Sequence, residues 1–402
     1  MRKAGLSQWL RGKQWLAWGG CLLALLSAVL WPHLEVPVGG KYRRVERFPP
    51  LIYLPDDGSK PRINAQAAIL VEAVSGMILY AKNEHERRPP ASTTKIMTAI
   101  VTLEKGDPAE VVTVSPKAAR TGGSSLWLKA GDRITLRELL EGVMLRSGND
   151  GSVALAEHIA GSEQAFAELM NRKAREIGAL NTNFRNPHGL TAPNHYTTAY
   201  DLALITRYGF GNPEFTRIVG AREEAIEWYQ GVKTRQVRNT NRLLWSLAGA
   251  DGVKTGTTNK AGYCLVASAT RDGRRFIAVV LNSPDRWGEA ACLLEYGFDH
   301  FELKQLARVG TPVTRVRLRQ GDPAAVELYP RRDLVVVLPK GKEGEAQSRI
   351  HLDFAALIPP VRAGTTVGRL SFYYQGQEVD WVELYPRERI RRDYWWRRFL
   401  RR

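Results

Sequence analysis

The sequence predicts an α/β (α+β) domain, in which helices flank an antiparallel sheet, followed by a small all-β sandwich domain. Two observations support this prediction. Strand patterns at both ends of residues 63–302 enclose a helical middle, so strands far apart in the chain can pair in one sheet with helices on its faces. From residue 303, short apolar runs separated by turn residues follow one another without a helical pattern. We therefore assign the β domain to residues 303–386.

The first elements follow residues 32–62, a segment rich in Pro, Gly and Arg that we interpret as a linker. Within residues 67–81, the runs AAILVEA and MILYA predict two strands joined by a Val-Ser-Gly turn. Pro89 and Pro90 then precede STTKIMTAIVTLEKG, whose apolar stripe predicts a helix that stops near Gly106.

The middle and end of the first domain continue this alternation. A second helix is predicted at 135–145; it breaks at 147–149 and restarts near Ser152. Strands at 262–270 and 276–281 are separated by Arg-Asp-Gly, a hairpin signal. The region closes with one more predicted helix, at residues 289–301. The β domain is then predicted from the runs VTRVRLRQG, AVELYP, LVVVLPKG, RIHLDF, TVGRLSFYYQG and DWVELYP.

Length and composition exclude several classes of protein. A chain of 402 residues suits two domains with appendages, and 44% hydrophobic with 25% charged residues is a globular composition. Three cysteines exclude a disulfide-rich scaffold. Seven scattered histidines without HExxH or CxxC motifs predict no metal site, and we expect no cofactor.

The net charge of +17 is concentrated at the two ends of the chain. Residues 1–14 carry four basic side chains and no acid, and residues 15–31 form an uncharged apolar run. As a helix this run is about 25 Å long, the short end of what spans a bilayer. A basic segment followed by an apolar run is the order of a secretory signal, so we expect export. Both a cleaved signal and an uncleaved anchor fit the sequence.

The C-terminal residues 387–402 hold eight arginines and two acids. Trp395, Trp396 and Phe399 can share one side of a short helix with arginines around them, which favours a segment lying on a membrane surface. A solvated basic tail is the alternative interpretation. Because the excess charge lies at the ends and no nucleic-acid motif occurs, we expect no nucleic-acid partner.

Three short motifs carry the candidate chemistry. Ser92 and Lys95 are spaced i, i+3, which places them on the same side of a helix. A serine hydroxyl is a weak nucleophile unless a base takes its proton, and a lysine is such a base only when its pKa is lowered. Ser147 and Asn149 lie in the break between two predicted helices, where a hydroxyl and an amide can point into a cleft.

The third motif is the run from Lys254 to Thr257. Lys254 supplies a cation, Thr255 and Thr257 supply hydroxyls, and Gly256 allows another backbone to approach closely. A free carboxylate is the natural ligand of such a strand. Taken singly, the SxxK motif also fits a capping serine with a surface lysine, the SxN motif fits an ordinary turn, and the KTG motif fits the start of a surface strand.

Together, in the order SxxK, SxN and KTG, the motifs are far more specific. The chain resembles the penicillin-recognising serine enzymes, and among them the low-molecular-mass penicillin-binding proteins that act as D-alanyl-D-alanine carboxypeptidases. The stretches PPASTTKIMTA, LRSGNDGSVALAEHIAG and GADGVKTGTTNKAGYCLVASAT carry this resemblance, which covers residues 61–300. It implies a transpeptidase/β-lactamase-like fold, with the catalytic domain at residues 63–302.

The resemblance implies a role for each motif. Ser92 would attack the carbonyl between the two D-alanines of a peptidoglycan stem peptide, and Lys95 would accept its proton. Ser147 would relay protons, and Asn149 would orient the substrate amide and Lys95. The terminal carboxylate would bind Lys254, Thr255 and Thr257, Gly256 would allow the close backbone approach, and the N–H groups of Ser92 and Thr257 would form the oxyanion hole. A β-lactam would trap the same serine.

Some alternatives stay open at this point. A β-lactamase-like hydrolase shares the fold and the serine, and a catalytically silent wall-binding protein would share the fold alone. The sequence leaves open whether Cys264 and Cys292 form a disulfide. We interpret His188, in NPHGL, as structural, and the sequence indicates no obligate protein partner.

Overall fold

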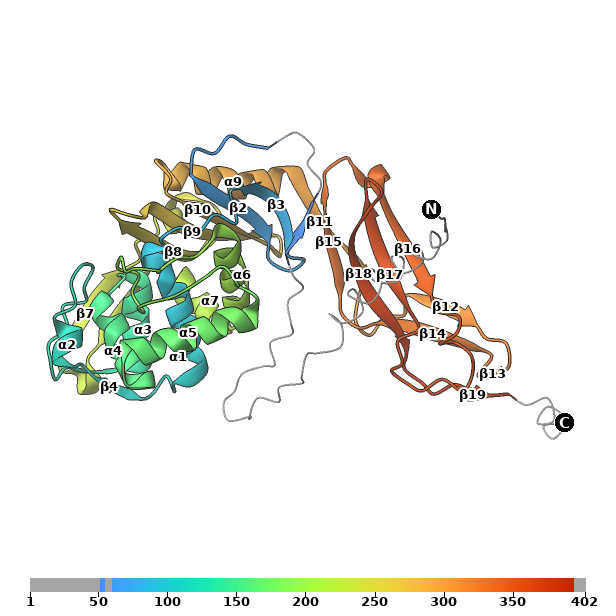
Figure 1. Cartoon of the computed structure of the whole chain (residues 1–402), viewed down its shortest axis with the longest axis horizontal. Coiled ribbons are helices and arrows are strands. Elements are labelled where there is room, and N and C mark those ends of the chain that lie inside the picture. Colours follow the sequence, from blue (N-terminus) through green and yellow to red (C-terminus); the bar gives the residue numbers. More distant parts are fainter. Residues whose placement is uncertain (1–50, 55–59, 394–402) are drawn as a thin grey trace, which may run out of the picture. The chain divides into compact units, whose positions relative to one another are not determined.

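The computed structural model describes residues 51–54 and 60–393 (Figure 1). The predicted basic segment at 1–14, the apolar run at 15–31, most of the predicted linker, and the part of the tail from residue 394 lie outside the described residues. No helix in the two described ranges is long and apolar enough to cross a bilayer.

The predicted antiparallel sheet is present and has six strands in the order β1-β3-β2-β10-β9-β8. Its strands are β1 (Ile52–Tyr53), β2 (Ala67–Glu72), β3 (Met77–Lys82), β8 (Ala250–Thr258), β9 (Gly262–Arg271) and β10 (Arg274–Leu281). Strands β2 and β10 pair with Ile69 opposite Val279, so the two ends of the domain join in one sheet as predicted. β1, which the sequence analysis did not predict, adds a parallel edge beside β3.

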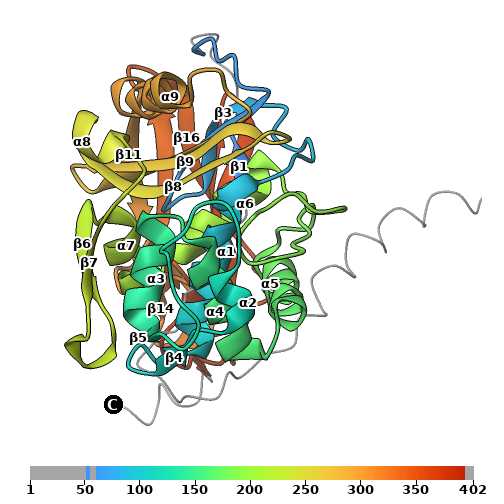
Figure 2. The ribbon, with the colours of Figure 1, turned by 90° about the vertical axis from the view of Figure 1, so that its left-hand side faces the viewer.

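The sheet is covered by helices on both faces. Successive residues of a strand point to opposite faces, and β2 is buried along its whole length. Ile69 and Val71 belong to a core with the main helical group, whereas Leu70 packs in a second core that includes Leu293 and Leu294 of α9 (Arg286–His300). Figure 2 shows α9 on one side of the sheet and helices α1, α3 and α4 on the other.

The helical group fills the middle of the domain. Its members are η1 (Ala91–Thr94), α1 (Lys95–Lys105), α2 (Pro116–Ala119), α3 (Leu136–Leu145), α4 (Asn149–Ala160), α5 (Glu163–Ile177), α6 (Ala199–Gly209), α7 (Pro213–Gly220), η2 (Tyr229–Gly231) and α8 (Leu243–Ser246). Two antiparallel strand pairs accompany them, β4 (Val111–Thr113) with β5 (Arg133–Thr135), and β6 (Glu223–Glu227) with β7 (Thr234–Arg238).

Two helix starts differ from the prediction. The break after α3 is shorter than expected, because α4 begins at Asn149 rather than near Ser152. α9 begins at Arg286 rather than at residue 289, because the side chain of Asp285 accepts a hydrogen bond from the Gly288 N–H and caps the first turn. Both shifts move a polar side chain into the first turn of a helix, and both side chains reach the site described below.

The rest of the described chain is all-β, as predicted. It comprises β11 (Phe301–Ala307), β12 (Thr314–Arg317), β13 (Gly321–Asp322), β14 (Ala325–Pro330), β15 (Leu334–Pro339), η3 (Glu343–Glu345), β16 (Ala346–Leu352), β17 (Gly368–Tyr374), β18 (Gln377–Pro386) and β19 (Arg391–Arg392). Five strands form the sheet β12-β14-β18-β17-β16. Ile390, which the sequence analysis places in the tail, is fully buried and bridges to Val361, so residues up to 392 take part in the β fold.

Candidate active site

Ser92 and Lys95 lie at the junction of η1 and α1. Ser92 is in the 3₁₀ turn and partly exposed, whereas Lys95 is the first residue of α1 and fully buried. The Lys95 Nζ atom lies 3.2 Å from the Ser92 Oγ atom. The i, i+3 spacing therefore brings the amine and the hydroxyl together, as the sequence predicts.

Two more oxygen atoms surround the Lys95 amine. Asn149 Oδ1 and the backbone carbonyl of His188 each lie 2.7 Å from Nζ. Both oxygens can only accept hydrogen bonds. A neutral amine has two N–H groups and one lone pair, so when both N–H groups donate to these oxygens the lone pair is left for the Ser92 hydroxyl.

Electrostatics favour the neutral form of this lysine. Burial lowers the pKa of Lys95 well below its ordinary value, the charge of Lys254 lowers it further, and Asp150 opposes the shift. A lysine whose pKa is lowered and whose lone pair faces a serine can accept the proton of that serine.

The turn between α3 and α4 holds Ser147 and Asn149. Ser147 has a left-handed backbone (φ 69°) and is buried, and its Oγ atom has no hydrogen-bond partner among the described residues. A buried hydroxyl without a partner requires an explanation, and a hydrogen bond to a ligand supplies one. Asn149 uses its amide N–H to donate to the Gly122 carbonyl at 2.7 Å, which fixes the orientation of Oδ1 toward Lys95.

Asp150 anchors the loop beside this turn, a role that the sequence analysis missed. Its buried carboxylate accepts hydrogen bonds from the N–H groups of Leu126 and Leu128 and from the Ser125 hydroxyl. A carboxylate with several donors is strongly held. Gly123 in the same loop has φ 84°, and a Cβ atom there would lie 2.7 Å from the Asn149 amide nitrogen, so only glycine fits.

The KTG strand is β8, which forms one edge of the six-stranded sheet. Lys254 is buried and its Nζ atom has no hydrogen-bond partner among the described residues. Burial, with a contribution from Arg286, lowers the pKa of Lys254 to about 7. A Cβ atom on Gly256 would lie 3.0 Å from the Ser92 backbone nitrogen, so β8 approaches the serine closely, as predicted.

The two threonines of this strand have different partners. The Thr255 hydroxyl lies 2.7 Å from the Thr240 hydroxyl, and Thr257 is exposed. Arg286, the first residue of α9, donates to the Thr257 hydroxyl at 2.8 Å and to the Gly256 carbonyl at 3.0 Å. Sequence reasoning missed Arg286 because only the sheet pairing brings the start of α9 beside β8.

Other candidate residues stay outside the chemistry. The His188 ring lies 3.2 Å from a Glu163 oxygen, so its side chain is used structurally while its carbonyl serves Lys95. Cys264 is buried and Cys292 is exposed, and both are free thiols. Within the described residues, no cluster of three or more His, Cys, Asp or Glu side chains is arranged to hold a metal ion.

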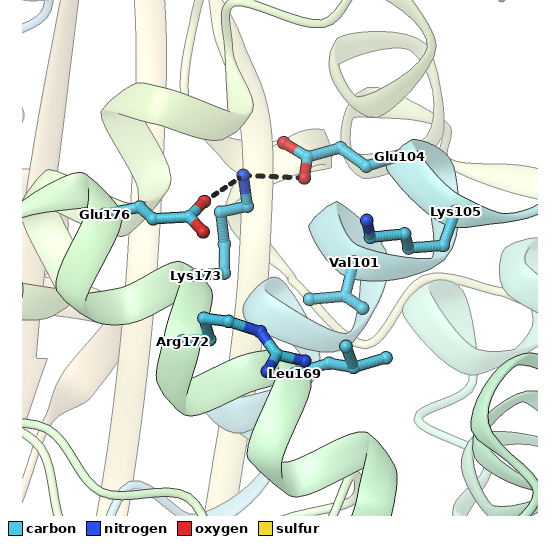
Figure 3. A pocket seen from close by; sticks show the side chains of 7 residues that line it. All are labelled: Val101, Glu104, Lys105, Leu169, Arg172, Lys173 and Glu176. Atoms are coloured by element: carbon cyan, nitrogen blue, oxygen red, sulfur yellow. Dashed lines mark ion pairs between the residues drawn. The ribbon is translucent and has the colours of Figure 1, made fainter. Parts of the chain in front are cut away.

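A separate small pocket lies between α1 and α5, at the opposite end of α1 from Lys95 (Figure 3). The Lys173 ammonium is 2.8 Å from both Glu104 and Glu176, which neutralise it. Because Lys173 is already paired and no serine, cysteine or histidine lines this pocket, we assign it no chemistry.

The fold and the SxxK geometry define a serine acyl-transfer enzyme of the penicillin-recognising class. Residues 56–285 match the family model described as D-alanyl-D-alanine carboxypeptidase, and residues 301–392 match the C-terminal domain of penicillin-binding protein 5. The chain belongs to the D-alanyl-D-alanine carboxypeptidase family.

Individual relatives agree along most of the chain. The D-alanyl-D-alanine carboxypeptidase DacF of Bacillus subtilis is 35% identical over 82% of this chain and 87% of its own length. DacD of Escherichia coli is 36% identical over 81% of this chain and 87% of its own length. Penicillin-binding protein 5 of Haemophilus influenzae matches in structure with a TM-score of 0.75, 33% identity and coverage of 83% of this chain and 99% of that one. The predicted family and enzyme class are confirmed.

Proposed function

We propose that Ser92 is the nucleophile that removes the terminal D-alanine from peptidoglycan stem pentapeptides. The observation that carries this proposal is the position of the buried Lys95 Nζ atom, 3.2 Å from Ser92 Oγ and 2.7 Å from two carbonyl oxygens. Ser92 Oγ forms a bond to the carbonyl carbon of the penultimate D-alanine, and its proton passes to Lys95 Nζ. The peptide bond breaks, the departing nitrogen takes up a proton, and free D-alanine leaves.

Water completes the reaction. It attacks the ester on Ser92, which releases the shortened peptide and returns the proton to the serine oxygen. Ser147 relays protons between Lys95 and the leaving nitrogen, which gives a use to a hydroxyl that has no hydrogen-bond partner among the described residues. The N–H groups of Ser92 and Thr257 stabilise the negative oxygen of each tetrahedral intermediate, a contribution of roughly 3 kcal/mol per donor.

The terminal carboxylate of the substrate binds at β8. Lys254, whose buried ammonium has no partner among the described residues, supplies the charge, and Thr255 and Thr257 supply hydroxyls. Arg286 adds a second cation at the same place. The outer edge of β8 has no neighbouring strand in the described part of the chain, so an extended peptide can lie along it. Asn149 orients the upstream amide, and a β-lactam occupies the same position.

We further propose that the enzyme works on the outer face of the cytoplasmic membrane. Residues 1–14 and 15–31 have the composition of a signal or anchor, the segment at 32–62 is a linker, and the aromatic, arginine-rich end of residues 387–402 suits a membrane surface. Vesicle flotation of the chain lacking residues 1–31, with and without residues 394–402, tests the tail. Equal flotation of both proteins would contradict membrane binding by the tail.

Release of D-alanine tests the central reaction. The purified enzyme is incubated with a peptide ending in D-Ala-D-Ala, and free D-alanine is measured beside the matched variant Ser92→Ala. We expect release by the wild type alone. No release by folded wild-type protein would refute the proposal, and equal release by Ser92→Ala would assign the reaction to another group.

A further inference from the structure

An exposed tryptophan with two arginines stands beside the candidate active site. Trp127 is 57% exposed, and the guanidinium carbons of Arg146 and Arg235 lie 4.8 Å and 4.9 Å from the centre of its ring system. We call these three residues the Trp127 platform. Arginine stacks on aromatic faces and still presents its N–H groups to other partners.

The platform is held in place by the chain around it. The Trp127 backbone N–H donates to the Ser125 hydroxyl at 2.7 Å, and that hydroxyl donates to the buried carboxylate of Asp150 at 2.6 Å. Arg235 donates to the Leu126 carbonyl at 2.6 Å. Trp127 has φ 56°, a left-handed backbone that is uncommon for a bulky residue and that gathers at functional sites.

No carboxylate among the described residues pairs with the two arginines of the platform. Neither Arg146 nor Arg235 forms an ion pair with a carboxylate in the described part of the chain, although both have the cation–π contact. Nearby basic residues do form such pairs; Lys233, for example, lies 2.9 Å from Asp132. Two guanidinium groups on one exposed ring therefore form a site for an anion, and a carboxylate fits a guanidinium with two hydrogen bonds.

The position of the platform indicates where that anion comes from. Arg146 directly precedes Ser147, and the loop that carries Trp127 accepts a hydrogen bond from the Asn149 backbone N–H through Ser124. An extended peptide advances about 3.3–3.6 Å per residue, so a side chain two or three residues before the cleaved bond lies about 7–11 Å from it. A substrate whose upstream amide meets Asn149 passes along this side of the site.

We propose that the Trp127 platform binds a free carboxylate carried by the stem peptide two or three residues before the cleaved bond. The enzyme thereby selects acidic stem peptides over amidated ones. This inference rests on the proposed D-Ala-D-Ala carboxypeptidase function and adds a specificity site to it.

A pair of substrates tests the inference. Two peptides ending in D-Ala-D-Ala differ only at the upstream residue, which carries a free carboxylate in one and a primary amide in the other. We expect wild-type kcat/KM to favour the acidic peptide about tenfold, mainly through KM, and the preference to shrink as salt is raised. Equal kcat/KM for the two peptides would overturn the inference. Release from neither peptide would instead overturn the proposed function.

Variants place the preference on the platform. In the double variant Arg146→Gln with Arg235→Gln, the ratio of acidic to amidated kcat/KM should fall to about one, with partial recovery when both residues are lysine. The control Arg172→Gln removes one exposed positive charge from α5, at the remote pocket, and should keep the wild-type ratio. A full preference in the double variant, or an equal loss in the control, would overturn the assignment.

Discussion

Replacing Asn149 by aspartate tests the base role of Lys95 most sharply. The change keeps the size of the side chain and turns the oxygen that lies 2.7 Å from Lys95 Nζ into a carboxylate oxygen. An effective dielectric constant near 20 gives about 6 kcal/mol of attraction between an ammonium and a carboxylate at that distance. The new carboxylate is itself buried, so we take about half of this value as the lower limit. The variant therefore favours the protonated form of Lys95 by about 3–6 kcal/mol.

This stabilisation has a kinetic consequence. Only neutral Lys95 can accept the Ser92 proton, and about 1.4 kcal/mol corresponds to a factor of ten. Acylation by a fluorescent penicillin at pH 7 should therefore slow by about 10²–10⁴-fold. Each further pH unit should recover up to a factor of ten relative to the wild type, because the neutral fraction of Lys95 grows with pH.

The pH dependence separates charge from damage to the loop. In the wild type the Asn149 amide donates to the Gly122 carbonyl, and the aspartate loses that contact. Loss of this contact would slow acylation equally at every pH, and Asn149→Ala controls for it. A deficit below tenfold at pH 7, or one that does not change between pH 6 and pH 9, would refute the lysine-base mechanism.

Three further predictions concern β8 and its neighbours. Gly256→Ala places a Cβ atom about 3.0 Å from the Ser92 nitrogen, which displaces an oxyanion donor; acylation should fall roughly 10–100-fold while the far-ultraviolet circular dichroism spectrum is retained, and unchanged acylation would contradict the contact. Arg286→Gln removes a cause of the lowered pKa of Lys254, so that pKa rises from about 7 and the alkaline limb of kcat/KM moves to higher pH; an unmoved limb would contradict this coupling. The unfolded chain holds a proton on Lys254 up to about pH 10.4. Between about pH 7 and 10.4 the unfolded chain therefore binds more protons than the folded state. The free energy of unfolding rises with pH across this window, and the full cost of burying the Lys254 charge is present below it. Lys254→Met should therefore raise Tm more at pH 6 than at pH 9.5, and an equal gain at both would show that the charge is not the cause.

The fold and the motif residues were predictable because their signals are local. The i, i+3 spacing of Ser92 and Lys95 is kept in the structure. The apolar runs at 67–72 and 276–281 predict buried strands, and these strands pair. Each of the three motifs is unspecific by itself, and their order along the chain made the prediction of the site specific. The structure places the Lys95 amine beside the Ser92 hydroxyl and the Asn149 amide oxygen, and it places Gly256 beside the Ser92 backbone nitrogen. The roles assigned to these residues are proposals.

The missed features depend on contacts between distant segments. The His188 carbonyl contacts Lys95 from 93 positions away in the chain. Every residue has a backbone carbonyl, so the residue type does not reveal this contact. Arg286 reaches β8 only through the register of the sheet. The β6–β7 hairpin was also missed, because each strand has a single buried residue among polar ones, which gives too weak an alternation. Helix α5, by contrast, has an apolar stripe at Phe166 and Met170 that would have predicted it.

The central claim is that Ser92 forms the acyl-enzyme. Intact mass after incubation with benzylpenicillin, on the wild type and on Ser92→Ala, measures this directly. We predict one long-lived adduct per molecule on the wild type and none on the variant. Consumption of the drug without an adduct would identify a β-lactamase-like hydrolase instead. An adduct on both proteins, or untouched drug with folded wild-type protein, would contradict the assignment of Ser92.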